Sequence, residues 1–310
     1  MSGKEGNMAG RLISLEASKL RQLDARQILE SISLSEGRVL AVETVGVVQP
    51  LLHDVSNAEL AAAMSADILI LNMYDVNEPI IKGLPEHKKP ESISLLKKLT
   101  GRIIGINLEP TDQTGDDLWR MSDGRKATAL NARKAKQQGA DIIVITGNPG
   151  NHVTNSAICS SIKEIREELG DEIILITGKM HASGQLDEAG ENIISKEEIK
   201  GFAEAGADII LLPAPGTVPG MTVEKVHELI SCIHSLNKLA MTAIGTSQEG
   251  ADTDTIKTIA YNCKMAGADI HHIGDAGYTG IAVPENIMTY SIVIRGVRHT
   301  YHKMAQSINR

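Results

Sequence analysis

A short motif recurs four times along the chain and strongly limits the architecture that the chain can adopt. Each copy reads Ser-Ala-Asp-Ile or Gly-Ala-Asp-Ile and opens an apolar run, with its aspartate at Asp67, Asp141, Asp208 or Asp269. Successive aspartates are 74, 67 and 61 residues apart, about the length of two strand–helix units. We therefore expect four repeats, each containing two strands and two helices.

Four further apolar runs lie between the motifs and complete a set of eight. They begin at Arg38, Arg102, Asp171 and Leu239, and a helical stretch follows each of the eight runs. Right-handed crossovers between such strands produce a parallel sheet that is buried on both faces. The predicted fold class is α/β, a (β/α)8 barrel in a single domain over residues 1–310.

The repeated motif has a structural explanation. Glycine after a helix supplies a left-handed C-cap, alanine packs closely, and the aspartate begins the next strand. Active sites of this fold lie at the opposite, C-terminal ends of the strands. We therefore expect the four aspartates to stabilise the barrel floor.

Two helical segments flank the predicted barrel. Within the N-terminal extension 1–36, residues 11–36 read as one amphipathic helix that either closes the barrel base or makes an oligomer contact. Residues 284–310 are predicted to form a helix after the eighth strand, and the proline-containing segment 77–90 is predicted to be partly loop. Because many barrels assemble, we expect a homo-oligomer.

Composition argues against several classes of partner. A net charge of −8 provides no basic surface for nucleic acid, and no apolar run reaches the roughly 18 residues of a membrane span. The N-terminus lacks the apolar segment of a signal peptide. Cys159, Cys232 and Cys263 have no metal-type spacing and suit a reducing compartment. We expect a cytoplasmic protein whose partner is a small molecule.

Carboxylates occur near the ends of the first and third predicted strands. Glu43 stands in the apolar run 39–46, where an unpaired charge is costly to bury, so it either faces the barrel mouth or forms a structural ion pair. Gly105, Asn107 and Glu109 share one face of the third strand because side chains alternate. A polar barrel mouth explains this face, and Glu109 is the strongest carboxylate candidate for catalysis.

Uncharged polar residues end the second and fourth predicted strands. Asn72 shares a face with Ile68 and Ile70, which predicts that it points to the barrel axis. Thr146 and Asn148 share parity, although the Asn-Pro-Gly-Asn sequence there equally suits a turn. The predicted substrate-binding residues of the second to fourth strands are Asn72, Asn107, Thr146 and Asn148.

The fifth predicted strand ends in two titratable residues, Lys179 and His181. A dehydrated lysine has a lowered pKa and can form a Schiff base. Lys179 could equally be a fixed cation for a phosphate or carboxylate, or an exposed loop residue. His181 is a candidate proton carrier or metal ligand.

Small residues follow the seventh and eighth predicted strands, where many barrels hold a phosphate through backbone N–H groups. This predicts a small anionic substrate, although Glu249 and Asp275 would repel an anion unless they turn away or are neutralised. His271 and His272 point to opposite faces, so only one can reach the axis. The candidate substrate-binding residues here are Gly245, Thr246, Ser247, Gly274, Asp275 and Gly277.

Three functions fit these residues. One is a lyase or isomerase acting on a small phosphorylated or carboxylated carbonyl compound, with Lys179 as electrophile or anion clamp and Glu43 or Glu109 as general base. Another is a barrel enzyme that depends on Mg²⁺ or another divalent cation, held by Glu43, Glu109, His181 and Asp275. The third is a non-catalytic barrel that binds an anion or phosphosugar.

The overall layout resembles phosphate-binding (β/α)8 barrels and, more loosely, the phosphoenolpyruvate mutase and isocitrate lyase-like group. The latter resemblance implies a Mg²⁺-assisted reaction on an α-keto acid. That group carries a Glu-Asp pair after a middle strand and a Lys-Cys-Gly-His loop after the next. This chain has Gly147-Asn148-Pro149 and Gly178-Lys179-Met180-His181 there, so the resemblance lies in strand order and not in the signature motifs.

Overall fold

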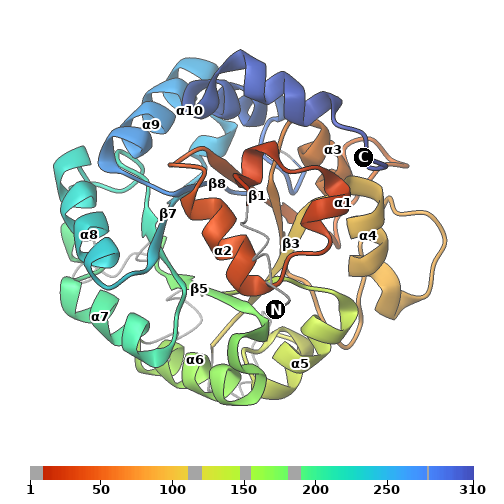
Figure 1. Cartoon of the computed structure of the whole chain (residues 1–310), viewed down its shortest axis with the longest axis horizontal. Coiled ribbons are helices and arrows are strands. Elements are labelled where there is room, and N and C mark those ends of the chain that lie inside the picture. The colour runs from red at the N-terminus through yellow and green to blue at the C-terminus, as the bar shows by residue number, and fades with distance from the viewer. Residues whose placement is uncertain (1–9, 111–120, 147–154, 181–189, 278) are drawn as a thin grey trace, which may run out of the picture.

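The computed structural model describes residues 10–110, 121–146, 155–180, 190–277 and 279–310. Eight parallel strands pair in chain order, and β8 pairs with β1 to close a barrel (Figure 1). The predicted (β/α)8 fold is confirmed. The strands are β1 (Val39–Val45), β2 (Ile68–Asn72), β3 (Ile103–Leu108), β4 (Ile142–Ile145), β5 (Ile174–Gly178), β6 (Ile209–Pro213), β7 (Leu239–Ile244) and β8 (Ile270–Ile273).

One α-helix follows each strand and packs on the outside of the barrel (Figure 1). Short 3₁₀ helices interrupt several connections, including one within residues 77–91, where a partial loop was predicted. None of the helices in the described part of the chain is both long and apolar enough to span a bilayer. The outer helices are α3 (Asn57–Ala63), α4 (Ser92–Thr100), α5 (Ala129–Gln138), α6 (Asn155–Leu169), α7 (Lys196–Ala205), α8 (Val223–Ser235), α9 (Thr253–Ala266) and α10 (Pro284–Ala305); the 3₁₀ helices are η1 (Leu12–Ser14), η2 (Lys89–Glu91), η3 (Asp123–Arg125), η5 (Gly170–Glu172), η7 (Gly190–Asn192) and η8 (Gln248–Gly250).

Alternation along the strands divides the apolar core into two layers. Ala41 of β1 and Ile70 of β2 belong to the cluster inside the barrel. Val42 and Leu69 belong to the larger cluster between the sheet and the outer helices. Because side chains alternate, residues two positions after an inner-layer residue also face the axis. This rule places Glu43 on the axis side near the carboxyl end of β1.

The N-terminal segment differs from the continuous helix predicted over residues 11–36. The chain breaks before α2 because Asp24 forms a capping box: its carboxylate accepts the N–H of Gln27, whose side chain accepts the N–H of Asp24. The segment forms three short helices, namely η1 (Leu12–Ser14), α1 (Ala17–Leu20) and α2 (Ala25–Ser33).

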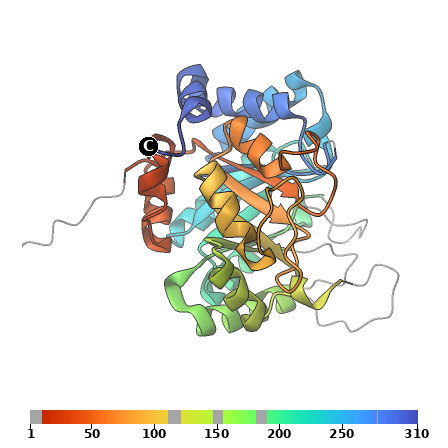
Figure 2. The same cartoon turned by 90° about the vertical axis from the view of Figure 1, so that its right-hand side faces the viewer.

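This segment closes one end of the barrel. Ile28 and Ile32 of α2 join the inner apolar cluster, and Figures 1 and 2 show α2 lying across the barrel base. The C-terminal residues reach the same end, where Arg310 O accepts the N–H of Ser18 at 2.8 Å. The packing therefore favours the base-closing role over the predicted oligomer contact.

The four motif aspartates repeat one arrangement at the barrel floor. Each carboxylate accepts a backbone N–H from the preceding strand, at Leu40, Ile104, Leu175 or Ala240. Each carboxylate also pairs with a cationic side chain of an outer helix, and these partners are Arg295, Lys97, Arg166 and His234 for Asp67, Asp141, Asp208 and Asp269 respectively. The expected structural role of the motif is confirmed.

The first of these arrangements is completely buried. Asp67 contacts Arg295, and Lys303 Nζ lies 3.3 Å from Asp67 Oδ1. Arg102 donates a hydrogen bond to Ala66 O at 2.7 Å beside them. Burial would raise the pKa of Asp67, but Arg295 and Lys303 outweigh it and hold the pKa below its usual range. The cluster joins α10 to the floor of the barrel.

Candidate active site at the carboxyl ends of the strands

A line of hydrogen-bonded polar side chains crosses the barrel mouth. Thr146 Oγ1 donates to Asn107 Oδ1 at 3.1 Å, and Asn107 Nδ2 donates to Asn72 Oδ1 at 3.4 Å. Asn72 Nδ2 in turn donates to Asp275 Oδ2 at 2.9 Å. The line joins the ends of β2, β3 and β4 to the loop after β8, so the structure brings together four of the predicted substrate-binding residues.

Glu43 and His272 form a buried pair in the same mouth. Glu43 Oε2 lies 3.1 Å from His272 Nε2, and the two residues are 6% and 2% exposed. Closure of the barrel places them together, because β1 and β8 are neighbours and Ala41 is in register with His272. Glu43 therefore faces the mouth, and its partner is a histidine that sequence reasoning did not count among the site residues.

His271 occupies the opposite face of β8, as the alternation predicts for one of the two histidines. Its Nε2 donates to Gly37 O at 3.0 Å, and its ring packs against Tyr290 of α10. Burial lowers the pKa of His271 to about 4, so it is neutral near pH 7. This histidine has a structural role under a helix.

Asp275 has an unusual electrostatic environment. Burial and the charge of Glu43 raise its pKa from 3.8 to about 6, against the opposing effect of the hydrogen bond from Asn72. A carboxyl group that titrates near neutral pH is suited to general acid–base catalysis. The sequence placed Asp275 among the substrate-binding and metal-ligand candidates, and the geometry adds this proton-transfer capacity.

Glu249, in η8 after β7, is a further carboxylate of the mouth. It is 1% exposed, its Oε1 accepts the N–H of Ala276 at 3.1 Å, and burial raises its pKa. Gly274 makes room for it, because a Cβ there would stand 3.0 Å from Glu249 Oε1. Within the part of the chain that the structure describes, Glu249 Oε2 and His272 Nδ1 are buried without hydrogen-bond partners.

Sequence reasoning treated Glu249 only as a charge that would repel an anion. Its burial depends on the course of η8, which Asn286 of α10 holds by donating to Glu249 O and Ala251 O. That contact joins segments far apart in sequence, so no local pattern indicates it. For His272, the alternation of the His-His pair was a usable signal.

Glu109, the strongest carboxylate candidate from the sequence, lies just beyond the end of β3 in an ion pair. Arg125 Nη2 of η3 is 2.5 Å from Glu109 Oε1, and the residue is 6% exposed. The pairing gives Glu109 a fixed cationic neighbour, in contrast to Glu43 and Asp275. Its role as a general base stays a prediction.

Lys179 lies on the helix side of the sheet. Met180 packs against the inner cluster and approaches Gly245, so alternation turns Lys179 toward the outer layer. There its Nζ is 3.8 Å from Glu198 Oε1 of α7, and the residue is buried. This placement favours a structural ion pair over the predicted Schiff base or anion clamp. His181 and Asn148 lie outside the described residues.

The loops after β7 and β8 are held mainly by internal contacts. Thr246 Oγ1 lies 2.8 Å from Thr217 O and 2.5 Å from Gln248 Oε1. Ser247 adopts a left-handed conformation (φ 74°), and a Cβ on Gly277 would stand 2.8 Å from the backbone of Ala282. The predicted contacts of Gly245, Thr246, Ser247, Gly274 and Gly277 with an anion stay a prediction.

The predicted metal ligands do not converge. Glu43 contacts His272, whereas Glu109 contacts Arg125. Across the described ranges, no three His, Cys, Asp or Glu side chains are arranged to hold a metal ion. The described residues therefore do not fit the predicted Mg²⁺ site.

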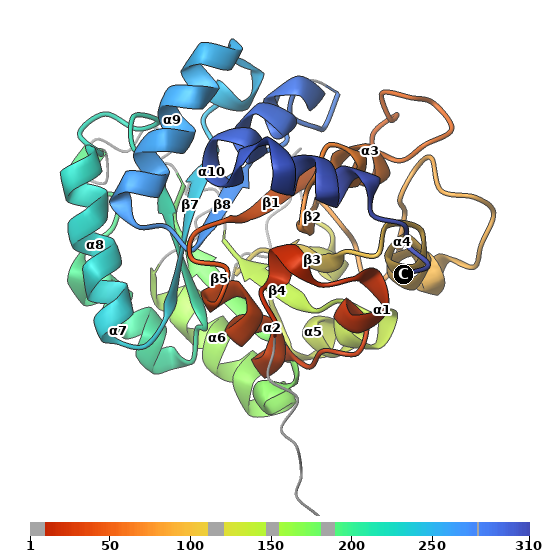
Figure 3. The ribbon, with the colours of Figure 1, turned by 45° about the horizontal axis from the view of Figure 1, so that its top comes forward.

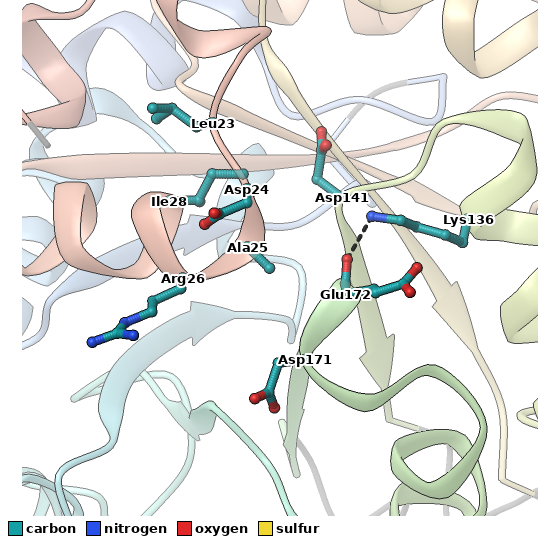
Figure 4. Close-up of a pocket in the computed structure, with 9 residues that line it drawn as sticks. All are labelled: Leu23, Asp24, Ala25, Arg26, Ile28, Lys136, Asp141, Asp171 and Glu172. Atoms are coloured by element: carbon teal, nitrogen blue, oxygen red, sulfur yellow. Dashed lines mark hydrogen bonds between the residues drawn. The ribbon is translucent and has the colours of Figure 1, made fainter. Parts of the chain in front are cut away.

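Two cavities mark opposite regions of the barrel. One of about 560 Å³ lies beside the mouth, lined by the loop after β6 together with Gln248 and Asn262. Another of about 410 Å³ lies at the floor (Figure 4). Two of its lining groups already have protein partners, since Asp24 caps α2 and Lys136 Nζ donates to Glu172 O. The floor cavity is lined by Leu23, Asp24, Ala25, Arg26, Ile28, Lys136, Asp141, Asp171 and Glu172.

Fold and site together define a (β/α)8-barrel protein with a carboxylate-rich mouth. Residues 13–310 match the family described as "Domain of unknown function (DUF7916)", and the chain belongs to this family. No curated protein matches the chain.

Two solved structures are similar to it at low sequence identity. A thiamine phosphate pyrophosphorylase from Pyrococcus furiosus is 14% identical, with a TM-score of 0.48, and the match covers 84% of this chain and 97% of that one. An aldolase named QR15 is 15% identical, with a TM-score of 0.44, and the match covers 84% of this chain and 98% of that one.

Proposed function

We propose that this protein is a barrel enzyme of the lyase or isomerase type that moves a proton on a small carbonyl compound. The observation that carries the proposal is the environment of Asp275. This carboxyl group is held by Asn72, has a pKa of about 6, and lies in the mouth where barrel enzymes have their active sites.

In the proposed reaction Asp275 acts as the general acid–base. Its ionised carboxylate removes a proton from the carbon next to the carbonyl, and the C–H electron pair forms the C=C bond of an enol. The carbonyl π pair moves to oxygen, which takes up a proton. Asp275 then returns its proton to carbon. The Glu43–His272 pair supplies a second group that can donate or accept a proton.

The anionic group expected on the substrate is a separate prediction. Lys179 pairs with Glu198, and the loops after β7 and β8 stand beside Glu249 and Asp275. These contacts supply no described cation for a phosphate next to the proposed base. The proposal therefore rests on proton transfer and not on phosphate recognition.

Solvent exchange tests the proposal directly. The full chain is incubated in D₂O with a panel of small α-hydroxy aldehydes, ketones and α-keto acids, each with and without a phosphate group, and loss of the α-proton signal is followed by NMR. We expect exchange with at least one compound and a loss of about 100-fold or more in Asp275→Asn. Asp171→Asn makes the same change at the exposed floor and is the matched control.

Two results would contradict the proposal. Wild-type protein that exchanges no α-proton across the panel argues against proton transfer on carbonyl compounds. If exchange persists unchanged in Asp275→Asn, the base has been assigned to the wrong residue. Ligand-induced thermal stabilisation without exchange or turnover would instead favour the non-catalytic binding protein.

A further inference from the structure

The carboxylates of the mouth stand close together with little positive charge among them. Glu43 and Glu249 each raise the pKa of Asp275, and Glu43 raises that of Glu249, because like charges oppose ionisation. His272 acts in the opposite direction on both groups. No lysine or arginine in the described ranges forms an ion pair with Glu43, Glu249 or Asp275.

Two buried polar atoms of this cluster lack partners, which is an independent observation. Glu249 Oε2 belongs to a residue that is 1% exposed, and His272 Nδ1 to one that is 2% exposed. A buried polar atom without a hydrogen bond is costly, since the group loses its water and gains nothing in return. A carboxylate oxygen can only accept, and a ring nitrogen accepts when Nε2 carries the proton that faces Glu43.

A ligand for this cluster must therefore bring positive charge and several donors. An ammonium group meets both requirements with one charge and three N–H donors. An anion meets neither, and the described residues do not converge as metal ligands. An uncharged hydroxyl can donate once but leaves the repulsion between the carboxylates in place.

We propose that the barrel mouth recognises its ligand through a primary ammonium group placed among Glu43, Glu249 and Asp275. This inference rests on the proposed function and names the substrate class: a small amine-bearing carbonyl compound. The ammonium group neutralises the mutual repulsion of the carboxylates and donates to the partnerless acceptors. The neighbouring amides of Asn72 and Asn107 then face the uncharged part of the substrate.

Three two-carbon probes test the inference on the full chain. Ethanolamine, ethylene glycol and glycolate share a skeleton and differ in carrying an ammonium, a hydroxyl or a carboxylate. Titration followed by NMR should give millimolar binding of ethanolamine, at least tenfold tighter than ethylene glycol, and no binding of glycolate. Ethanolamine should bind more weakly at pH 5 than at pH 8, because Asp275 is protonated at the lower pH.

Two variants assign the binding to the cluster. Asp275→Asn and Glu249→Gln should each weaken ethanolamine binding at least tenfold, whereas Asp171→Asn at the floor should leave it unchanged. Circular dichroism checks that each variant folds, and Asp275→Asn remains informative if the buried Glu249→Gln does not. An equal effect of Asp171→Asn would show that general surface charge holds the amine, and would overturn the inference.

The same titrations separate this inference from the proposed function. Equal binding of the three probes, or tighter binding of glycolate or inorganic phosphate, overturns ammonium recognition. If α-proton exchange still depends on Asp275 in that case, the proposed function stands without it. If ethanolamine binds through the cluster but no exchange occurs, ammonium recognition stands and the proton-transfer proposal fails.

Discussion

The floor and the mouth of the barrel both contain buried carboxylates, but the two ends differ in what surrounds them. At the floor, each of the four motif aspartates accepts a strand N–H and contacts a cationic side chain. At the mouth, Glu43, Glu249 and Asp275 stand beside one another, with His272 between strands. Identical chemical groups thus stabilise one end and leave the other poised for chemistry.

This difference appears in the direction of the pKa shifts. The pKa of Asp67 is lowered, because Arg295 and Lys303 outweigh its burial, whereas that of Asp275 is raised by burial and by Glu43. A carboxyl group stabilises the folded state where the fold favours its charged form and destabilises it where the fold opposes that form. The floor carboxylates therefore contribute stability near neutral pH, and the mouth carboxylates reduce it.

Replacing Asp67 should have the largest effect on stability. Asp67→Asn keeps a side chain that can accept the N–H of Leu40 but leaves Arg295 and Lys303 buried without a counter-ion. We expect a loss of about 3–5 kcal/mol in the free energy of unfolding by urea at pH 7. Asp171→Asn, which changes an exposed floor carboxylate, should stay within about 0.5 kcal/mol of the wild type. A loss below about 1 kcal/mol for Asp67→Asn would break the comparison.

Asp275→Asn should have the opposite sign. The pKa of Asp275 is 3.8 when unperturbed and about 6 in the folded chain, so the folded state prefers the protonated form. The wild type should lose stability as the pH rises from 3.8 through 6, by on the order of 1–3 kcal/mol from this group. Asp275→Asn should be more stable than the wild type at pH 7 and should lack this pH dependence. Urea unfolding at pH 4, 5, 6 and 7 measures both, and a destabilised variant at pH 7 would contradict the prediction.

Removing the hydrogen bond from Asn72 should produce a smaller change. Asn72 lowers the pKa of Asp275, so Asn72→Leu should raise the midpoint of the pH–rate profile for α-proton exchange by about half a unit to one unit. The maximal rate above that midpoint should change less than in Asp275→Asn. An unchanged midpoint together with a lower rate at every pH would show that Asn72 acts only on substrate binding.

The side of the barrel belongs to neither end and should show the smallest effect. Tyr261 and Met265 of α9 and Val297 and Tyr301 of α10 are exposed, and the two helices lie side by side (Figure 3). If the predicted homo-oligomer uses this face, Tyr301→Lys should reduce the molar mass measured by light scattering. Its unfolding free energy per chain at low concentration should stay within about 0.5 kcal/mol of the wild type. An unchanged mass for an oligomeric wild type would place the contact elsewhere.

Several elements of the fold were accessible from the sequence because their signals are local. Glycine C-caps, apolar runs and the repeated aspartates identify strand starts within a few residues. The predicted fifth strand begins at Asp171, whereas β5 begins at Ile174, because residues 170–172 form the turn η5. The continuous N-terminal helix was wrong for a related reason: the capping box at Asp24 starts a new helix, and amphipathic periodicity continues across the break.

The candidate site was only partly accessible. Alternation placed Glu43, Asn72 and Asn107 toward the axis, since side-chain direction along a strand is a local property. The same reasoning could not choose a partner for Lys179, which pairs with Glu198 of the following helix. It also ranked Glu109 above Asp275, because the ion pair of Glu109 with Arg125 arises from the course of the loop after β3.

The sequence by itself determined the number of strands, their order and the structural role of the floor aspartates. Periodicity and capping act over a few residues, so they can be read without knowing the partners. Only the tertiary structure decided that Glu43 meets His272, that Asn72 meets Asp275, and that Glu249 is buried beside them. These contacts require β8 to close on β1, and the closure joins residues about 200 positions apart. The chemistry of the mouth therefore follows from barrel closure, which no local pattern specifies.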